Sequence, residues 1–275
     1  MRTIVHLSDL HFGREDPTLL DPLAAAVEEA QPHVVVVSGD LTQRARPAQF
    51  RRARCFLERL PLPQLVVPGN HDVPLYDVLG RLVRPLERFR RHVSDDLEPA
   101  WRDDEVVIVG VSTARARTLT RGRIGLAQIA AIRGWFEAAG PEAVRVLVTH
   151  HPLDLPAARS ARHLAGRAEL AVSELARSRV DLLLAGHLHT SHAGSTVERH
   201  RLAGRAAVFV QAATSCSTRL RGEANGFNVL RVAADDIAVE HHAFDSATSS
   251  FAVRARERFR RGVEGWERVA GAARG

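Results

Sequence analysis

Short, continuous runs of Val, Leu and Ile are the dominant pattern along the chain. They show little alternation of polar and apolar residues, which is typical of strands buried on both faces. We expect strands at residues 3–7, 33–37, 64–67, 106–111, 144–148 and 181–185. A short apolar run is also compatible with a buried helix, so the segments between the runs decide the fold class.

Helical patterns lie between these runs. Asp21-Pro22 resembles an N-cap followed by proline at the first helical position, and Gly140-Pro141 resembles a helix end. We expect helices at residues 23–30, 47 to about 60, 126–139 and 166–178. Strands that alternate with helices in this way predict an α/β sandwich.

The pattern changes after Gly194, where strands follow one another without helices. Residues 206–212, 227–232 and 237–242 read as strands, and Asn225-Gly226 is a strong turn signal. We therefore expect a second, mostly antiparallel region packed on the first. Because no repeat or linker interrupts the chain, we expect residues 1–275 to form one domain.

Two further segments carry helical spacing. Residues 73–101 have apolar side chains at near-helical intervals and predict a helical hairpin, either packed on the core or acting as a cap that helps to choose the substrate. The C-terminal tail, residues 251–275, is rich in Arg and Ala. Its Phe259, Val263 and Trp266 are about four apart and predict a helix on the surface.

The amino-acid composition is typical of a globular protein with a modest positive charge. The chain has 275 residues, 45% of them hydrophobic, which is enough for a substantial core. Its formal net charge is +6, and every one of its 38 basic residues is Arg. A modest positive charge favours anionic substrates. The basic residues form no concentrated stripe of the kind that dedicated nucleic-acid binders carry.

The cysteine content and the hydropathy of the chain argue against a disulfide-rich protein, a CxxC zinc protein and a membrane-spanning protein. Cys55 and Cys216 are far apart, so neither a disulfide scaffold nor a CxxC zinc motif is expected, and each should be a small buried residue. The N-terminus lacks the apolar region of a signal peptide, and no run approaches a membrane span. We expect a cytoplasmic protein without a membrane partner.

Side chains that bind metals follow five of the predicted strands. The segments are Asp9-Leu10-His11, Gly39-Asp40, Gly69-Asn70-His71-Asp72, Thr149-His150-His151-Pro152 and Gly186-His187-Leu188-His189. Because sites form at the carboxyl ends of strands in α/β sheets, these side chains should converge. Any one of them alone is more often a hydrogen-bonded structural residue. Together they are too many for one ion, and a carboxylate such as Asp40 can bridge two.

The order of these blocks resembles the signature of the calcineurin-like metallophosphoesterase family. The matching blocks, Asp-x-His, Gly-Asp, Gly-Asn-His-Asp, His-x-Pro and Gly-His-x-His, span residues 9 to 189. The resemblance implies a four-layer αββα sandwich, with two mixed β-sheets flanked by helices. The His-His-Pro and Gly-His-Leu-His forms are similar to those of class III cyclic-nucleotide phosphodiesterases and glycerophosphodiesterases.

The resemblance also implies roles for individual residues. One metal ion would be held by Asp9, His11, Asp40 and His189, and the other by Asp40, Asn70, His150 and His187. Asp40 would bridge the two ions, and His150 takes the His-x-Pro position beside its neighbour His151. His71 would act as the acid or transition-state stabiliser, and Asp72 would orient it. The cofactors would be two divalent ions, Mn, Fe or Zn.

The implied reaction is hydrolysis of a small phosphodiester, with a metal-bridging hydroxide as nucleophile. A phosphomonoesterase or a nucleotide-sugar pyrophosphatase on the same scaffold is the first alternative. A non-catalytic, Arg-rich nucleic-acid-binding protein is the second, although such a protein would not need seven metal ligands. Arg44, Arg115, Arg117 and Arg121 could add phosphate contacts, and His192 could lie near the site, but each of them fits a solvated surface residue better.

Overall fold

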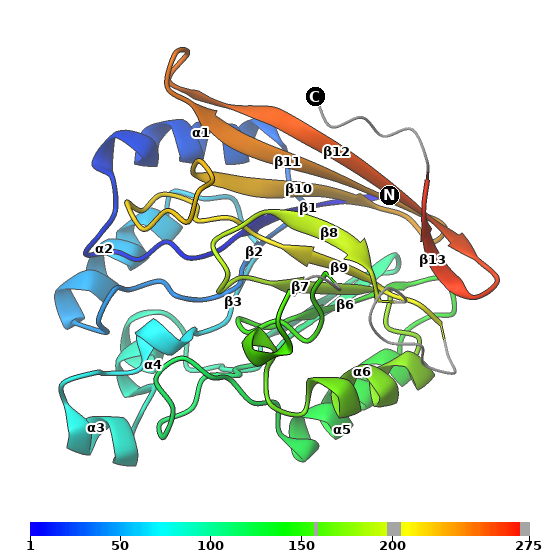
Figure 1. Cartoon of the computed structure of the whole chain (residues 1–275), viewed down its shortest axis with the longest axis horizontal. Coiled ribbons are helices and arrows are strands. Elements are labelled where there is room, and N and C mark those ends of the chain that lie inside the picture. The colour runs from blue at the N-terminus through cyan, green and yellow to red at the C-terminus, as the bar shows by residue number, and fades with distance from the viewer. Residues whose placement is uncertain (157–158, 197–204, 270–275) are drawn as a thin grey trace.

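The computed structural model describes residues 1–156, 159–196 and 205–269. In it, two β-sheets lie face to face and helices cover their outer sides (Figure 1). The sequence-based prediction of a four-layer αββα sandwich is therefore confirmed.

The first sheet has seven strands. In spatial order they are β13 (Gly265–Arg268), β12 (Ser250–Gly262), β11 (Asp236–Asp245), β10 (Gly226–Val232), β1 (Arg2–Leu7), β2 (Val34–Val37) and β3 (Gln64–Val66). Strands β1, β2 and β3 are parallel, whereas β10 pairs antiparallel with β1 and the ladder stays antiparallel out to β13. The parallel half of this sheet carries the early sequence motifs.

The second sheet has six strands. In spatial order they are β4 (Ala100–Arg102), β5 (Val106–Gly110), β6 (Val144–Val148), β7 (Leu182–Ala185), β9 (Val208–Gln211) and β8 (His192–Ser195). The four central strands are parallel, and β4 and β8 pair antiparallel at the two edges. All six strands expected from the apolar runs are present in the two sheets.

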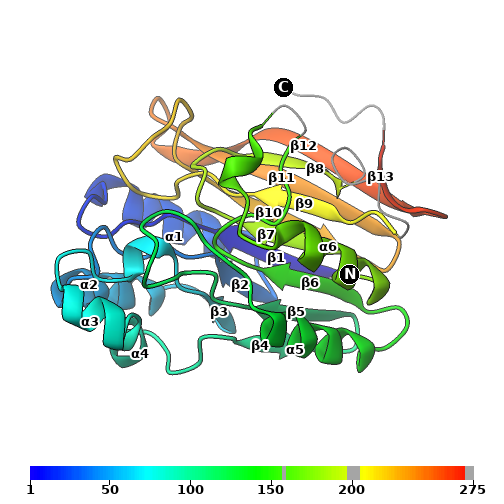
Figure 2. The ribbon, with the colours of Figure 1, turned by 60° about the horizontal axis from the view of Figure 1, so that its bottom comes forward.

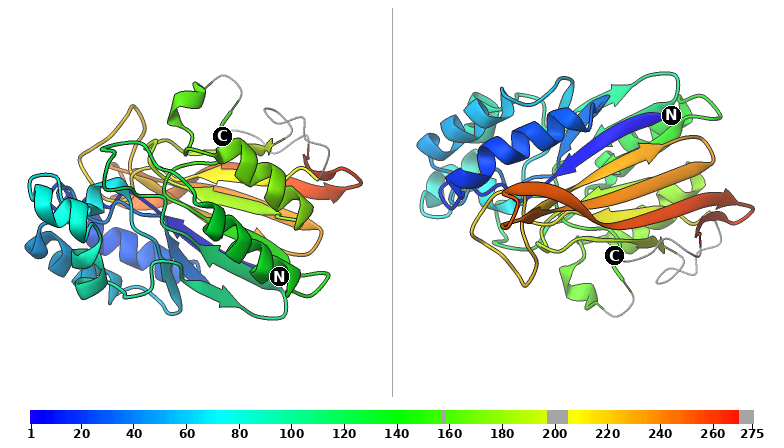
Figure 3. Two further views of the ribbon diagram at one scale, coloured as in Figure 1. Left: turned by 90° about the horizontal axis from the view of Figure 1, so that it is seen from below. Right: turned by 90° about the horizontal axis from the view of Figure 1, so that it is seen from above.

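Helices pack on the outer face of each sheet (Figures 2 and 3). The helices are α1 (Leu20–Glu29), α2 (Pro47–Leu57), α3 (Val78–Val83), α4 (Glu87–His92), α5 (Leu126–Glu137) and α6 (Ala168–Arg177), with short 3₁₀ turns at Pro17–Leu19, Asn70–Asp72 and Ala161–His163. Helix α1 begins at Leu20, so Asp21 lies in its first turn and is not the N-cap that the sequence suggested.

Three apolar layers hold the sandwich together. Along β2, Val34 and Val36 belong to the core between the sheets, whereas Val35 and Val37 belong to the core beneath α1 and α2. The third layer joins the second sheet to α5 and α6. Since both faces of the central strands are covered, these strands can be apolar at every position, which explains the continuous runs in the sequence.

Two sequence-based predictions for the C-terminal part of the chain are wrong. Strands β10 to β13 do not form a separate region packed on the first, because β10 hydrogen-bonds to β1 and extends the first sheet. The tail forms strands β12 and β13 and not a helix; residues 270–275 lie outside the described part. Along β12 the side chains alternate between covered and exposed, which is strand periodicity, and Val263 lies in the exposed turn after it.

Two further predictions, for residues 73–101 and for the two cysteines, can be compared with the structure. Residues 73–101 do contain a pair of short helices, and Phe89 of α4 is buried in the core against Phe50 of α2. Cys55 is exposed on α2, whereas Cys216 is buried, so the expectation that both are buried is wrong for Cys55. Among the described residues, no helix is long and apolar enough to cross a membrane.

Candidate metal centre

The predicted metal-binding residues lie in loops at the carboxyl ends of five strands from both sheets. The first sheet supplies Asp9, His11, Asp40 and Asn70, and the second supplies His150, His187 and His189. The two sheets therefore meet at this edge, and the side chains from both converge into one buried cluster.

Five of these seven residues have a left-handed backbone conformation. Their φ angles are 54° at Asp9, 47° at His11, 53° at Asp40, 74° at His187 and 60° at His189. Such angles are uncommon outside glycine and cluster at functional sites. Gly39 also has a positive φ, of 96°, and a Cβ there would lie 2.8 Å from the His150 ring and from the Gly69 amide. The loops can approach this closely only because residue 39 is glycine.

One group of ligand atoms forms around Asp9. The Oδ1 atom of Asp9 lies 3.5 Å from Nε2 of His11 and 3.5 Å from Nε2 of His189. The two imidazole rings stack almost in parallel, with centroids 5.1 Å apart. Two imidazole nitrogens and a carboxylate oxygen thus face one small volume.

A second group forms around His150. Its Nε2 atom lies 3.3 Å from Oδ2 of Asp40 and 3.1 Å from Oδ1 of Asn70. The ring of His187 approaches from β7, with its centroid 5.2 Å from that of His150. Nitrogen and oxygen donors therefore converge here as well.

Asp40 connects the two groups. The same Oδ2 atom that faces His150 lies 3.7 Å from Nε2 of His11 in the first group. Its Oδ1 atom accepts a hydrogen bond from the backbone N–H of His71, which fixes the carboxylate. Asp40 is thus placed to share a carboxylate between two neighbouring ions.

Hydrogen bonds at the Nδ1 atoms orient the rings of His150 and His189. Nδ1 of His150 bonds the Ser38 carbonyl at 2.8 Å, and Nδ1 of His189 bonds Oγ1 of Thr214 at 2.6 Å. Thr214 in turn donates to the Arg219 carbonyl. Each Nδ1 therefore carries a proton, so Nε2 is the ring nitrogen that faces the site and would bind a metal ion.

Unpartnered buried atoms show that this cluster fits metal ions. Among the described residues, Oδ1 of Asp9 and both ring nitrogens of His11 are buried without a hydrogen-bond partner. Buried polar atoms in proteins are nearly always paired. Imidazole with carboxylate and amide oxygens suits Mn, Fe or Zn, so the donor set and the orphaned atoms agree.

The charges within the cluster are also those of a metal site. Burial would raise the pKa of Asp40, but His150 and His71 hold it well below its usual value. Burial lowers the pKa of His187 to about 3 and that of His189 to about 4. The Asp40 carboxylate is therefore ionised and these two imidazoles are neutral, as metal binding requires. At His150 burial is outweighed by the charge of Asp40, which raises the pKa to about 9, so an ion bound there would displace a proton from Nε2.

His71 lies beside the cluster and is partly exposed. Its ring meets that of His11 edge-on, with centroids 4.8 Å apart, and its Nδ1 lies 2.8 Å from the Gln43 carbonyl. Its Nε2 lies 2.9 Å from an Nη atom of Arg219. Arg219 thus lies directly against Nε2.

Asp72 has a different set of partners from the one expected. Its carboxylate accepts hydrogen bonds from the N–H groups of Leu41, Thr42 and Gly69 and from the Thr42 hydroxyl. The expected contact with the His71 ring is replaced by these bonds, and the Gln43 carbonyl orients the ring instead. Asp72 ties the loop after β2 to the loop after β3.

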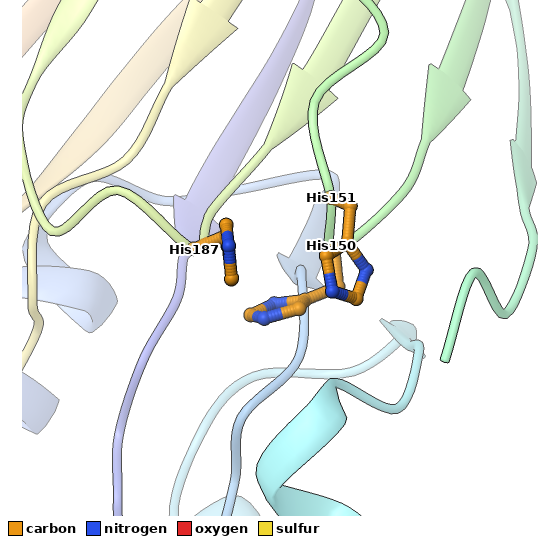
Figure 4. A group of neighbouring side chains, drawn as sticks. All are labelled: His150, His151 and His187. Atoms are coloured by element: carbon orange, nitrogen blue, oxygen red, sulfur yellow. The ribbon is translucent and has the colours of Figure 1, made fainter. Parts of the chain in front are cut away.

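His151, the neighbour of His150, has its own role in packing. Figure 4 shows the rings of His150, His151 and His187 close together, the first two after β6 and the third after β7. Nδ1 of His151 bonds the Thr113 hydroxyl at 2.8 Å, and its Nε2 is without a partner among the described residues. Because it is His150 that faces Asp40, the geometry supports His150 as the ligand at the His-x-Pro position.

Two arginines border the site. Arg219 approaches both nitrogens of His71 and also Gln43, from a loop that follows β9. Sequence reasoning missed it, since it lies 30 residues after the last motif and only the fold brings it here. Arg44, which the sequence singled out without assigning it to the site, also lies 3.3 Å from Nδ1 of His71. His192 begins β8, and its ring stacks on Phe209.

Comparisons with known proteins agree with this geometry. A family model described as calcineurin-like phosphoesterase matches residues 2–191. The chain is 33% identical over 90 residues to a probable cyclic nucleotide phosphodiesterase of Synechococcus, covering 29% of this chain and 35% of that protein. It is 35% identical over 80 residues to the glycerophosphodiester phosphodiesterase GpdQ of Enterobacter lignolyticus, covering 25% of this chain and 29% of that protein.

The alignments thus span about a third of these two relatives' own lengths. Among solved structures, a dimetal phosphatase from Danio rerio superposes with a TM-score of 0.66 at 14% identity, covering 92% of this chain and 98% of that one. At this identity the superposition shows the fold alone.

Proposed function

Because the chain belongs to the calcineurin-like phosphoesterase family, we propose that it hydrolyses small phosphodiesters at a pair of divalent metal ions. The observation that carries this proposal is the position of Asp40, whose carboxylate faces His11 of one ligand group and His150 of the other. Diesters of the cyclic-nucleotide or glycerol type are favoured over monoesters, since the two curated relatives are named as phosphodiesterases.

The residues assigned to the two ions follow from the two groups. Asp9, His11 and His189 would hold one ion, Asn70, His150 and His187 would hold the other, and Asp40 would contact both. When bound, such a pair supplies an activated water nucleophile and positive charge for the phosphoryl oxygens. Mn, Fe and Zn all suit these ligands.

His71 would supply the proton to the leaving group. Its Nδ1 faces the Gln43 carbonyl, so a second proton would sit on Nε2, the nitrogen that faces Arg219. From there it can pass to the leaving alkoxide, which is a poor leaving group as an anion. Asp72 would act indirectly, by holding the loops that carry Asp40 and His71.

Arg219 would bind a phosphoryl oxygen. Its guanidinium lies 2.9 Å from Nε2 of His71 and is near enough to the cluster to feel the charges of Asp40 and Asp9. Guanidinium groups bind phosphate oxygens through two parallel hydrogen bonds. Binding of the phosphodiester would draw Arg219 onto the phosphate and free Nε2 of His71 to act as the acid.

A substrate panel with added Mn²⁺ tests the proposed function. It should compare bis-aryl and aryl phosphates, cyclic nucleotides, glycerophosphodiesters and nucleotide sugars, with Asp40→Asn as the inactive control. Diesters are expected to be hydrolysed fastest. Preference for monoesters or for nucleotide sugars would replace the proposed substrate class, and DNA binding with a steep salt dependence but without hydrolysis would contradict an enzyme.

A further inference from the structure

Helix α3 presents its apolar side chains to solvent and buries its charged one. Val78, Leu79, Leu82 and Val83 are all exposed, Leu79 to 75%, whereas Arg81 is only 7% exposed. Tyr76, just before the helix, is exposed as well. A surface helix normally has the opposite polarity, and an exposed apolar cluster indicates an interaction site.

Arg81 fixes this orientation. Its guanidinium donates to the carbonyls of Pro74, Ala116 and Thr118. Three of its N–H donors are paired with carbonyls of two segments, so the helix cannot roll over without leaving buried donors unpaired. The same bonds place the loop of residues 115–123 directly against α3.

That loop adds positive charge and one more apolar side chain. Residues 115–123 contain four arginines and no acidic residue, and Leu119 between them is 59% exposed. A cavity of about 670 Å³ opens on this loop, and five arginines line it. They are Arg115, Arg117, Arg121, Arg123 and Arg167. Such a set of guanidinium groups is suited to phosphate.

This surface borders the metal centre. The Leu119 carbonyl accepts a hydrogen bond of 3.1 Å from the side-chain amide of Asn70. Gly122 packs so closely on His151 that a Cβ would overlap the ring. Whatever occupies the arginine-lined cavity therefore lies next to the loops that hold the ligands.

We propose that α3 and the loop of residues 115–123 dock the protein on the surface of an anionic phospholipid bilayer. Apolar side chains of α3 and Leu119 would enter the boundary between head groups and acyl chains, while the arginines bind lipid phosphates. The combination of an exposed apolar helix with an adjacent cluster of arginines favours a membrane over a protein groove. This proposal departs from the sequence-based expectation of no membrane partner, which rested on the lack of an apolar signal region and of a spanning segment.

Co-sedimentation of the full chain with vesicles tests this proposal. Binding should be strong to vesicles of phosphatidylglycerol mixed with phosphatidylcholine, weak to phosphatidylcholine alone, and reduced by salt. Arg117→Gln with Arg121→Gln should weaken binding about 30-fold, because two charges near the surface are removed. Leu79→Asp with Leu82→Asp should abolish it. Val263→Asp, in an exposed turn after β12, is the matched control and should bind as the wild type does.

Three outcomes would overturn the proposal. They are no vesicle binding by the wild type at low salt, equal binding by all variants, and a concentration-dependent dimer that Leu79→Asp with Leu82→Asp disrupts while vesicles have no effect. Metal content and hydrolysis of a small aryl diester, measured in parallel, should be unchanged in Leu79→Asp with Leu82→Asp and in Val263→Asp. A failure of membrane docking is thereby distinguished from a failure of the proposed hydrolysis.

Discussion

Under the proposed function His71 serves the leaving group and not a metal ion, a role that is compatible with Nδ1 bonded to the Gln43 carbonyl and Nε2 facing Arg219. His71→Ala should therefore keep both ions. It should slow hydrolysis of alkyl or ribose diesters by about 10²–10⁴-fold, the usual contribution of a general acid, and activated aryl diesters much less. Steady-state kinetics on matched alkyl and aryl substrates measure this ratio. Equal losses on both would indicate electrostatic stabilisation, and a lost ion would make His71 a ligand.

Arg219 provides a second test at the level of one residue. Arg219→Ala should lower kcat/KM for diesters about 10–100-fold, since a hydrogen bond to a charged group contributes roughly 1.5–3 kcal/mol. Inorganic phosphate should also become a weaker competitive inhibitor, and free guanidinium should restore part of the activity. Arg221→Ala, an exposed arginine on the same loop, is the control and should have little effect. Unchanged inhibition by phosphate in Arg219→Ala would exclude the proposed contact.

The buried side chain of His6 in β1 should make the stability of the protein depend on pH. Burial, opposed by the charge of Asp9 and assisted by that of His241, lowers its pKa to about 3. As the pH falls below about 6.5, the unfolded chain takes up a proton that the folded chain does not, so stability is lost as the pH falls. At pH 5 this loss amounts to about 2 kcal/mol from His6.

Urea denaturation of metal-free protein at pH 7 and pH 5 measures this effect. His6→Gln should be less stable at pH 7 but should lose about 2 kcal/mol less than the wild type between the two pH values. Parallel pH dependences for both proteins would mean that His6 is not buried in its neutral form.

The convergence of the candidate ligands could be predicted from the sequence, whereas the contacts that support them could not. Each ligand follows an apolar strand directly, so its position depends on local pattern and on the general rule for strand ends. Thr214 and Arg219 reach the site through the path of a loop after β9, and the partners of Asp72 lie on two other loops. Such contacts depend on tertiary packing, which leaves no periodic signal in the chain.

Among the elements, the C-terminal strands show where periodicity misled. Phe259, Val263 and Trp266 are about four apart and suggest a helix, but Val263 is in a turn and is 95% exposed, while Trp266 is 1% exposed on β13. The alternation along β12 was the informative pattern. By contrast, the central parallel strands were predictable because both of their faces are buried.

Trp266 should therefore contribute strongly to stability. Its indole N–H donates to Asp181 Oδ1 at 2.9 Å, which ties the edge of the first sheet to the start of β7. Trp266→Ala should lower the free energy of unfolding by about 3–5 kcal/mol. Val263→Ala, three residues earlier, should change it by less than about 0.5 kcal/mol. Chemical denaturation of both variants makes the comparison, and similar small effects would contradict the strand assignment.

At the scale of the whole molecule, the candidate metal centre lies at the carboxyl ends of strands from both sheets. Four of the candidate ligands follow strands of the first sheet and three follow strands of the second. Bound ions would therefore connect the two halves of the sandwich. Ligands that bind only the folded state stabilise it, by about 2.7 kcal/mol per site at a free concentration of 100 Kd. Adding Mn²⁺ should thus raise Tm in the wild type.

The same thermal shift should nearly disappear in Asp40→Asn, since this residue faces both ligand groups. His189→Gln should retain an intermediate shift, because it removes a ligand from one group only. Differential scanning fluorimetry over a Mn²⁺ titration provides these values. An undiminished shift in Asp40→Asn would place the stabilising ions elsewhere on the protein.

The central claim is that two ions share Asp40 between ligands from two sheets. Anomalous diffraction at the Mn absorption edge, from crystals grown with excess Mn²⁺, tests it most directly. We predict two adjacent peaks, one bounded by Asp9, His11 and His189 and the other by Asn70, His150 and His187, with the Asp40 carboxylate in contact with both. A single peak, or two peaks of which only one contacts Asp40, would contradict this account of the site.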